Sequence, residues 1–434
     1  MNAANTSLAV NPTKLTPLRP KQAREHESSP AEANRQKCVS IASGSRLVET
    51  VVSPEGRFQF AVSGHPHLQD SFVRDDGTEV DPSYNLKTMW ETGLVKFPSR
   101  PAPYGSTERL LEEITKFICR YANVPKEWME IISLYVLMTW VYDRFTAVGY
   151  LRFLGEPGTG KTRMLQLCAA ISYKPTIASG NITGPALFRT LDLVRGTMAV
   201  DEGDFKNSEE WSDMTKVLNN GYASGAPVVR CSGNDFMPES FHIYGPKIIS
   251  TRSRFGDEAL ESRCLTFETR EQPLPAHIPL QLPLHFDMEA CSLRNQLLQW
   301  RFDNFHRVEA REEGMRDLFP RSVQIGSSLA AVVPNEESLK RLVEFLSRND
   351  AGRRAESPKG IVLQALEQTR ALKRSSATVG YLAKVASTIS EDLGGEELTA
   401  RKVGGILRSL GYVPRRTNSG YTVDLANESA QVNV

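Results

Sequence analysis

The sequence predicts an α/β protein that combines a strand-and-helix core, a helical lid, a small β-rich N-terminal region and a C-terminal winged helix. Three observations support this prediction. The stretch Gly155–Thr162 follows the pattern G-x-x-x-x-G-K-[ST] between an apolar run and a helix-compatible run. A second apolar run, Thr197–Val200, ends in two carboxylates. Near the C-terminus, three helical patterns precede a strand, a turn and another strand.

The length of the chain allows several parts. With 434 residues it can hold about two to four domains. We expect the following division: a disordered tail over 1–45, the β-rich region over 46–102, the core over 103–270, the lid over 271–350, the winged helix over 351–425 and a second tail over 426–434.

Charge, cysteines and apolar stretches limit the class of protein. The formal net charge is only +1, so any nucleic-acid partner has to be argued from local patches. The six cysteines are scattered without a C-x-x-C pair, which favours reduced thiols. The longest apolar stretch, Ile131–Tyr142, is too short to span a bilayer, and no signal peptide is visible. We therefore expect a cytoplasmic protein with no membrane partner.

The part before the glycine-rich stretch predicts a β-rich region and two helices. Apolar residues flank a Ser-Pro-Glu-Gly turn in Arg46–Val62, which indicates a hairpin, and Phe72–Val80 holds a second turn signal. Helical spacing predicts a helix over Thr107–Arg120 with Ser106 as its N-cap. The next helix, about Glu127–Arg144, is apolar on most sides and should be packed inside.

The glycine-rich stretch predicts a phosphate-binding loop. Glycines let the backbone curl so that successive N–H groups point at phosphate oxygens, and the following helix adds the positive end of its dipole. Lys161 should reach the β- and γ-phosphates, and Thr162 should ligate Mg²⁺. The alternative is a turn without a ligand, but the complete pattern between a strand and a helix favours a nucleotide. The expected nucleotide-binding residues are Gly155, Pro157, Gly158, Thr159, Gly160, Lys161, Thr162 and Arg163.

The acidic pair after the next buried strand predicts a hydrolytic site. Asp201 should hold Mg²⁺ through water, and Glu202 should polarise the attacking water as a general base. An acidic pair after a strand is usually a solvated turn. Its place beyond a complete phosphate loop favours the catalytic interpretation.

A further strand with a polar end is expected at Gly245–Thr251. Some ATPases have an added catalytic strand beside the phosphate-loop strand, and its tip carries a polar sensor of the γ-phosphate. Ser250 or Thr251 could fill that role. The alternative is an ordinary strand end with hydroxyl groups.

Three arginines follow in the segment Arg252–Leu265. Surface arginines are usually salt-bridged bystanders, whereas a ring ATPase needs an arginine near this point to stabilise charge on a neighbour's γ-phosphate. Arg263, just before the strand Cys264–Phe267, is our choice for this catalytic role, and Arg254 is the alternative.

Helices beyond a proline-rich crossing suit a lid over the nucleotide. They are expected at Phe286–Val308, Arg321–Val332 and Pro334–Ser347. Arg321 could be the lid arginine that touches the γ-phosphate, although arginines are common at helix starts.

The C-terminal part predicts a winged helix after a break at Asn349–Ser357. Helices are expected over Gly360–Leu372, Val379–Ile389 and Leu398–Leu410, followed by strands at 411–413 and 421–423. Five cations and no acid occur between the third helix and the wing: Arg401, Lys402, Arg408, Arg415 and Arg416. This clustering is typical of duplex DNA binding, and the alternative is a protein contact.

Taken together, four segments resemble the core of AAA+ ATPases: Gly155–Thr162, Asp201-Glu202, Lys247–Arg252 and Ala259–Leu265. More closely, they are similar to helicase-like proteins of bacterial mobile elements and phages, distant relatives of the minichromosome maintenance helicases. The Ala-Leu-Glu-Ser-Arg segment resembles the motif where those helicases place their arginine finger. The resemblance implies a homo-hexameric ring, ATP and Mg²⁺ as cofactors, and single-stranded DNA in a central channel.

One stretch bears on such a channel. Ala226–Tyr244 contains apolar residues on both sides of a Ser-Gly-Asn-Asp turn, which indicates a hairpin. In helicase-like relatives a hairpin at this position contacts DNA in the pore, and Arg230 is its one clear cation. The alternative is a structural hairpin that packs on the edge of the sheet.

These observations leave three functional hypotheses. The first is an ATP-driven DNA helicase or translocase, or a replication initiator, of a mobile genetic element. The second is an ATP-dependent DNA-binding loader or regulator without unwinding activity. The third is an AAA+ ATPase that remodels a protein partner. A primase partner would have to lie on another chain, because the β-rich segment is too short for one.

Overall fold

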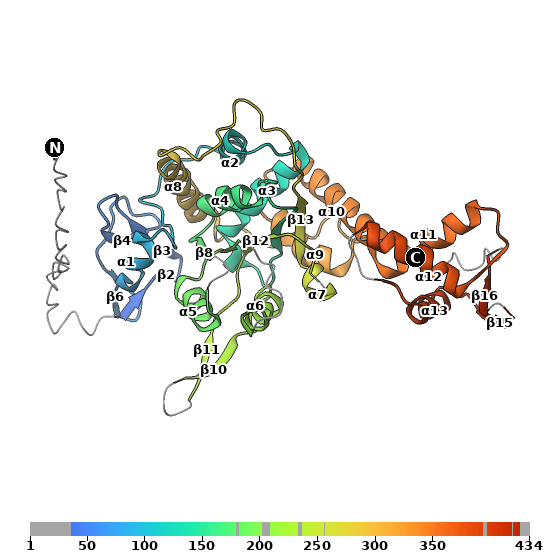
Figure 1. Cartoon of the computed structure of the whole chain (residues 1–434). Coiled ribbons are helices and arrows are strands. Elements are labelled where there is room, and N and C mark those ends of the chain that lie inside the picture. The colour runs from blue at the N-terminus through green and yellow to red at the C-terminus, as the bar shows by residue number, and fades with distance from the viewer. Residues whose placement is uncertain are drawn as a thin grey trace, which may run out of the picture.

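A five-stranded parallel sheet lies at the centre of the molecule (Figure 1). The computed structural model describes residues 36–178, 182–201, 209–232, 237–255, 257–393, 397–418 and 420–425. From one side to the other, the strands follow the order β13-β7-β12-β9-β8. Their bounds are Cys264–Glu268 (β13), Tyr150–Leu154 (β7), Lys247–Thr251 (β12), Met198–Val200 (β9) and Thr176–Ala178 (β8).

Strand β12 lies between the strand that precedes the glycine-rich loop and the strand that precedes the acidic pair. Thr251 pairs with Leu154 of β7, and Ile249 pairs with Val200 of β9. The predicted added strand is therefore confirmed. Because the strands are parallel and in register, the ends of β7, β12 and β9 meet at one edge of the sheet, which we call the carboxyl edge. The opposite edge, where β7, β12 and β13 begin, is the amino edge.

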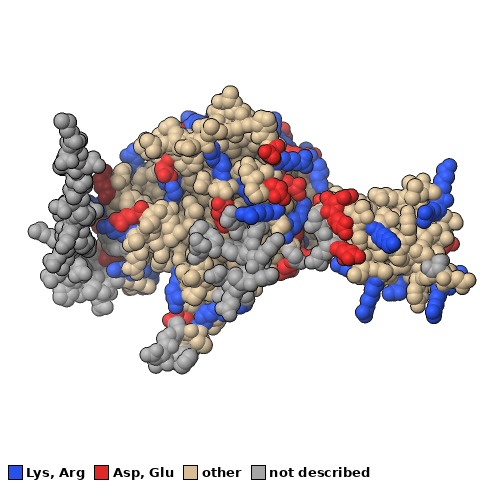
Figure 2. Space-filling model, viewed as in Figure 1, with Lys and Arg blue, Asp and Glu red and all other residues tan. Residues whose placement is uncertain are grey.

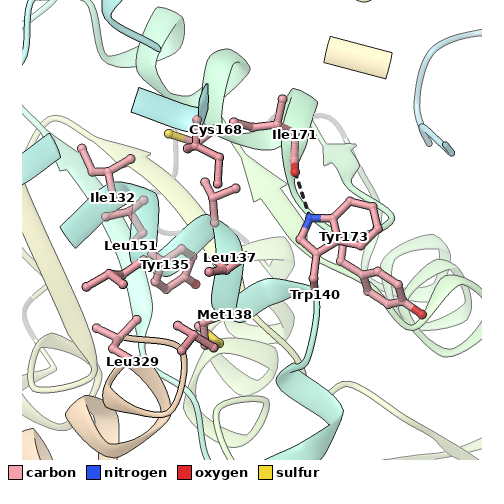
Figure 3. Close-up of a cluster of buried hydrophobic side chains, with 14 of the residues drawn as sticks. Ile132, Tyr135, Leu137, Met138, Trp140, Leu151, Cys168, Ile171, Tyr173 and Leu329 are labelled. Carbon is pink, nitrogen blue, oxygen red and sulfur yellow. Dashed lines mark hydrogen bonds between the residues drawn. The ribbon is translucent and has the colours of Figure 1, made fainter. Parts of the chain in front are cut away.

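Buried apolar side chains from the sheet and from the helices that pack on it form the main core (Figure 3). They come from α3 (Lys126–Thr139), β7, α4 (Lys161–Ile171) and α9 (Pro320–Ala330). Helix α3 ends earlier than expected. After Thr139 the chain turns so that the Trp140 indole N–H donates to the Ile171 carbonyl at 3.0 Å, and a short η3 (Tyr142–Arg144) follows.

The helices assigned to a lid share this core. Helix α8 (Phe286–Asn304) packs against α2 (Thr107–Tyr121) and α4, while α9 packs against α3 and α10 (Glu336–Glu356). The structure therefore does not divide these helices from the core as a domain of their own. The predicted Ser106 cap of α2 is confirmed, since its hydroxyl accepts from the Arg109 N–H at 3.2 Å.

The N-terminal region is β-rich, as expected, but begins inside the predicted tail. The hairpin is confirmed as β3 (Arg46–Val52) and β4 (Phe58–Val62), and the second turn joins β5 (Phe72–Val73) to β6 (Glu79–Pro82). Two strands precede them, β1 (Gln36–Cys38) and β2 (Ser40–Ser43), so the tail assigned to 1–45 is too long. Apolar pairing explains the error, because Ile41 of β2 faces Val48 of β3. The region closes with η2 (Tyr84–Leu86) and α1 (Lys87–Glu91).

A buried carboxylate fastens this region to the core. Glu49 of β3 lies 2.7 Å from the Lys174 ammonium and 2.9 Å from the Arg301 guanidinium of α8. Arg301 also pairs with Asp143 at 2.7 Å, and its guanidinium holds the pKa of the Asp143 carboxyl below its usual range despite burial of that group. Since a buried ion is costly without its partners, breaking this network should weaken the attachment of the N-terminal sheet to the core.

A hairpin extends away from the body of the molecule (Figure 1). It consists of β10 (Val228–Ser232) and β11 (Met237–Phe241), which pair antiparallel and confirm the predicted hairpin. At its base lie α5 (Gly184–Val194) and α6 (Glu209–Asn220). Among the described residues, no helix is both long and apolar enough to cross a membrane.

The C-terminal module has three helices, a three-stranded antiparallel sheet and its own core. The helices are α11 (Pro358–Ala371), α12 (Val379–Asp392) and α13 (Ala400–Ser409); the sheet has the order β14-β16-β15, with β14 at Ser376–Thr378, β16 at Gly420–Asp424 and β15 at Arg415–Thr417. The strand expected at 411–413 is wrong. Gly411 has a φ of +85°, which ends α13 and turns the chain, so that pairing starts later at Arg415.

The break expected at Asn349–Ser357 is also wrong. Helix α10 continues through Glu356, and α11 starts at Pro358, so Ser357 alone separates the two helices. A proline disfavours the helical conformation in the residue before it. Pro358 therefore explains why the helix is interrupted at Ser357. The main body and the C-terminal module are thus joined by helix rather than by an irregular linker.

Candidate functional site

The glycine-rich loop connects β7 to α4 at the carboxyl edge. Gly158 and Gly160 have φ angles of +85° and +91°, a conformation that strains other residues. A side chain at Gly155 would also clash, because its Cβ would lie 2.5 Å from the Thr269 carbonyl oxygen. The sequence pattern thus marks positions where this backbone needs glycine, and most of the loop is exposed.

Two hydroxyls and an ammonium shape the loop from inside. The Lys161 ammonium donates to the Glu156 carbonyl at 2.7 Å, and the Thr159 hydroxyl donates to the same carbonyl at 2.8 Å. Thr159 also meets the hydroxyl of Thr269 at 2.7 Å, and Thr269 donates to the Leu154 carbonyl at 3.1 Å. Sequence reasoning missed Thr269. Its signal was a hydroxyl directly after β13, the strand beside β7.

Three oxygen-bearing side chains converge next to the loop. The Thr162 hydroxyl donates to Asp201 Oδ1 at 3.1 Å, and the Ser250 hydroxyl donates to the same oxygen. Hydroxyl and carboxylate oxygens are the ligands that Mg²⁺ prefers, so these residues fit the expected ion. Thr251, the other sensor candidate, is buried, and its hydroxyl has no hydrogen-bond partner among the described residues. Glu202, the expected general base, lies outside the described residues.

Space for part of a ligand opens on the other side of the loop. A cavity of about 390 Å³ is lined by the loop residues Gly155, Glu156 and Thr159, together with Glu268, Thr269, Arg270 and Glu271 from the end of β13 and the turn after it. It lies across β7 from Asp201, because β13 and β12 flank β7 on opposite sides. A ligand with phosphates near Asp201 could therefore extend into this cavity.

Arg163, an expected nucleotide-binding residue, contacts protein carbonyls. Its guanidinium donates to Tyr121 at 3.3 Å, Pro279 at 3.1 Å and Leu280 at 2.5 Å. It thereby fastens the proline-rich crossing to α4 and the end of α2. The prediction for Arg163 followed from its position after Thr162, which does not determine the direction of a helical side chain.

The expected arginine finger and the expected lid arginine meet on one tyrosine. The guanidinium of Arg263 lies 4.4 Å from the ring centroid of Tyr222, and that of Arg321 lies 4.6 Å from it. Arg263 also donates to Asn219 Oδ1 at 3.0 Å. Hydrogen bonding from Arg321 lowers the pKa of the Tyr222 hydroxyl. We call Arg263, Tyr222 and Arg321 the arginine cluster.

The arginine cluster lies at the amino edge, away from the loop. The Tyr222 carbonyl accepts from the Val148 N–H at 2.8 Å, and the Arg263 carbonyl accepts from the Tyr150 N–H at 2.9 Å. Both contacts are at the start of β7, whereas the loop follows the end of β7. At the usual rise per residue, the two ends of this strand are about 13 Å apart. The structure therefore does not bring Arg263 or Arg321 together with Lys161 of the same chain.

Arg254, the alternative finger, is engaged by carboxylates. Its guanidinium lies 2.8 Å from Glu268, 3.3 Å from Glu356 and 3.4 Å from Glu261. Glu261 also pairs with Arg152, which is fully buried within β7. These contacts make Arg254 part of the bracing around β13.

The expected DNA-contacting cations occupy two separate places. Arg230 lies on β10, where its guanidinium is 5.1 Å from the Phe188 ring and its register partner is Glu239. The other five are exposed on the C-terminal module, with Arg401, Lys402 and Arg408 on α13 and Arg415 and Arg416 on β15. Lys and Arg side chains project from this module in Figure 2.

Comparisons with known proteins give distant likenesses. No family model matches the chain, and no curated protein matches it. It is similar in structure to the C-terminal region of NrS-1 in an apo form, with 12% sequence identity and a TM-score of 0.34 over 87% of this chain and 96% of that chain. It is also similar to the active helicase Cch of SCCmec type IV, with 12% identity and a TM-score of 0.40 over 91% of this chain and 80% of that chain. Overlaps this weak do not establish a family or a shared activity.

Proposed function

We propose that this chain is an ATP-hydrolysing DNA helicase or translocase, or a replication initiator, of a mobile genetic element. The observation that carries the proposal is the convergence of Thr162, Asp201 and Ser250 beside the loop that holds Lys161, at the carboxyl edge of a sheet in which β12 separates β7 from β9. This strand order and these residue types are what the resemblance to AAA+ ATPases leads us to expect.

In this proposal each side chain has one task in hydrolysis. The N–H groups of the loop and the Lys161 ammonium bind the phosphates, and Lys161 exchanges the Glu156 carbonyl for a phosphate oxygen. Thr162 and Asp201 would hold Mg²⁺, which when bound neutralises charge on the β- and γ-phosphates. Ser250 or Thr251 senses the γ-phosphate, and Glu202 polarises the attacking water.

The arginine cluster supports a site shared between chains. Arg263 and Arg321 lie at the amino edge, away from the phosphate loop of their own chain. A γ-phosphate that they stabilise therefore belongs to a neighbouring chain. A head-to-tail arrangement of this kind closes into a ring, and the resemblance implies six copies. Arg254 remains the alternative finger, although its carboxylate partners argue against it.

The cations on the two projecting parts are assigned to DNA. We assign the five exposed cations of the C-terminal module, taken as a winged helix, to duplex DNA, and Arg230 of the hairpin to a single strand in the channel. Because most of these cations lie on the module and one lies on the hairpin, a loader or regulator without unwinding activity is the second candidate.

DNA-stimulated ATP hydrolysis tests this proposal. We expect wild-type protein to hydrolyse ATP faster with DNA, Lys161→Ala to lower turnover at least about 100-fold because charge on the phosphates loses its nearest cation, and Glu202→Gln to bind ATP without turnover. Lys116→Ala is the matched control, since Lys116 pairs at 3.0 Å with Glu113 on the surface of α2.

The same assay separates the candidates. Equal hydrolysis with and without single- or double-stranded DNA would reject the DNA motor, and wild-type turnover in Lys161→Ala would reject the site. Strand separation on a forked substrate distinguishes a helicase from a loader. DNA affinity should fall steeply as salt rises, because the exposed cations displace counterions from phosphates.

A further inference from the structure

The C-terminal end of α10 holds the backbone on both sides of Arg263. The guanidinium of Arg353 donates to the Ser262 carbonyl at 3.2 Å and to the Cys264 carbonyl at 2.5 Å. These residues are the immediate neighbours of Arg263 in the chain. Burial lowers the pKa of the Arg353 guanidinium, in keeping with an enclosed contact. A shift of α10 along its axis would therefore move the peptide that carries Arg263.

The same turn of α10 holds the start of α9, which carries Arg321. The Asp350 carboxylate accepts from the Phe319 N–H at 2.8 Å and from the Ser322 hydroxyl. Asp350 is only 2% exposed, so these donors replace the water that its oxygens would otherwise contact. Because residues three apart lie on one helix face, Asp350 and Arg353 grip the two arginine-bearing segments from the same side. The segments that carry the two arginines of the arginine cluster thus share one support.

The connection from α10 to the C-terminal module is a single residue, and the two helices contact each other directly on both sides of it. Ser357 ends α10 and caps α11, since its hydroxyl accepts from the Gly360 N–H at 3.0 Å. Gln364 of α11 donates to the Ala355 carbonyl of α10 at 2.8 Å. The helices approach so closely at this elbow that a Cβ on Gly360 would lie 1.9 Å from the Arg354 carbonyl. Rotation of the module therefore acts directly on the last turn of α10.

We propose that Asp350 and Arg353 are positioning residues for Arg321 and Arg263, and that α10 transmits duplex binding at the C-terminal module to this pair. The inference rests on the proposed function, because it concerns how DNA controls hydrolysis. Duplex DNA that binds one orientation of the module more tightly shifts α10 toward the matching position. The two arginines then move together into, or out of, reach of the neighbour's γ-phosphate.

Opening the elbow tests this coupling without touching either site. Gly360→Ala forces α10 and α11 apart, and Gln364→Leu removes one hydrogen bond across the elbow as a milder change. The readout is the ratio of ATP hydrolysis with duplex DNA to hydrolysis without it. For a coupling of ordinary size, about 5-fold or more in wild type, we expect the ratio to fall to about 1 in Gly360→Ala. Its duplex affinity should stay within about 2-fold of wild type, since the exposed cations of the module have not changed.

A matched control and a second readout separate coupling from damage. Arg348→Gln changes an arginine of the same helix that pairs at 3.1 Å with Glu127, and it should keep the wild-type ratio. Hydrogen exchange in α9 should change on adding duplex DNA to wild type and stay constant in Gly360→Ala. If wild type is stimulated by duplex DNA and both elbow variants are stimulated equally, this inference fails while the proposed function stands. A wild-type protein that does not hydrolyse ATP rejects the proposed function itself.

Discussion

The two edges of the central sheet carry different kinds of polar side chain. At the carboxyl edge, short polar side chains such as Thr162 and Ser250 surround one carboxylate, and the glycine loop beside them is exposed. At the amino edge, two long cationic side chains already contact an aromatic ring. Both edges have room beside them, with a cavity of about 390 Å³ at the loop and one of about 690 Å³ next to Arg321, but at the amino edge the cationic groups already contact one aromatic ring. This difference agrees with the proposal in which the carboxyl edge works within one chain and the amino edge works between chains.

The amino edge holds a long cationic side chain that is buried and whose hydrogen-bond donors are only partly satisfied. Arg263 is only 8% exposed, and its Nε has no hydrogen-bond partner among the described residues. A buried polar group without a partner costs about 1–3 kcal/mol. Asp201, in contrast, accepts from two hydroxyls. A guanidinium that keeps one donor unused at such a cost is suited to a partner that arrives later.

Mixing two inactive variants is the strongest test of this division. Lys161→Ala removes the loop cation, and Arg263→Ala removes the amino-edge cation. Each alone should lower ATP hydrolysis at least about 100-fold. In an equal mixture, activity should return, because roughly a quarter of the interfaces then combine an intact loop with an intact arginine. The measurement is steady-state hydrolysis after the two variants are co-assembled.

The mixture has an internal control. Combining Lys161→Ala with a Lys161→Ala, Arg263→Ala double variant leaves no intact loop and should stay inactive. If the mixture of single variants also stays inactive while both assemble, the two edges do not complement each other between chains. If Arg263→Ala alone keeps full activity, and if Arg254→Ala recovers activity only when it is mixed with Lys161→Ala, the arginine finger is Arg254.

A buried lysine at the amino edge predicts how stability depends on pH. Lys247 opens β12, and its ammonium donates to the carbonyls of Gly221, Ile243 and Gly245. Burial lowers the pKa of Lys247 to about 7, whereas an unfolded lysine titrates near about 10.4. Between these values the unfolded chain binds more protons, so this group makes the free energy of unfolding rise with pH.

The test compares wild type with Lys247→Met. From pH 7 to 10, the free energy of unfolding of wild type should rise relative to the variant, by on the order of a few kcal/mol. Urea unfolding at each pH measures this difference, which also cancels contributions from the other titrating groups. Lys126→Met, on the exposed start of α3, should show no such pH-dependent difference. A constant difference for Lys247→Met would contradict the lowered pKa.

The carboxyl edge was largely predictable from the sequence, and the amino edge was not. The loop, its strand and the polar tip of β12 are contiguous patterns whose chemistry depends on local spacing, so they could be identified without a fold. The contact between Arg263 and Arg321 through Tyr222 joins residues far apart in the chain, and no local pattern records it. The sequence pattern singled out each arginine separately, but it did not predict that the two contact the same ring.

Helix boundaries failed where long-range packing decides them. The stretch Asn349–Ser357 is polar and charged, which suggested a break, but Asp350 and Arg353 are turned inward onto α9 and β13. Similarly, nothing in the hairpin pattern of Arg46–Val62 singles out Glu49, which meets Lys174 and Arg301 inside the core. In both cases the partner that explains a polar residue is distant in sequence. The same reason hid Thr269, whose hydroxyl braces the loop.

Tyr222 provides the smallest and most selective test of the amino edge. Tyr222→Leu removes the ring between the two guanidinium groups, and loss of contacts worth about 1–2 kcal/mol should lower hydrolysis about 5- to 30-fold. Tyr222→Phe keeps the ring and removes the hydroxyl together with its hydrogen bond from Arg321, so its loss of activity should be smaller than that of Tyr222→Leu. Tyr381→Leu is a matched control, because Tyr381 also faces an arginine, Arg374, but on the C-terminal module. Equal rates in Tyr222→Leu and wild type would show that the ring does not position the arginines, and equal losses in Tyr222→Leu and Tyr222→Phe would assign the effect to the hydroxyl instead.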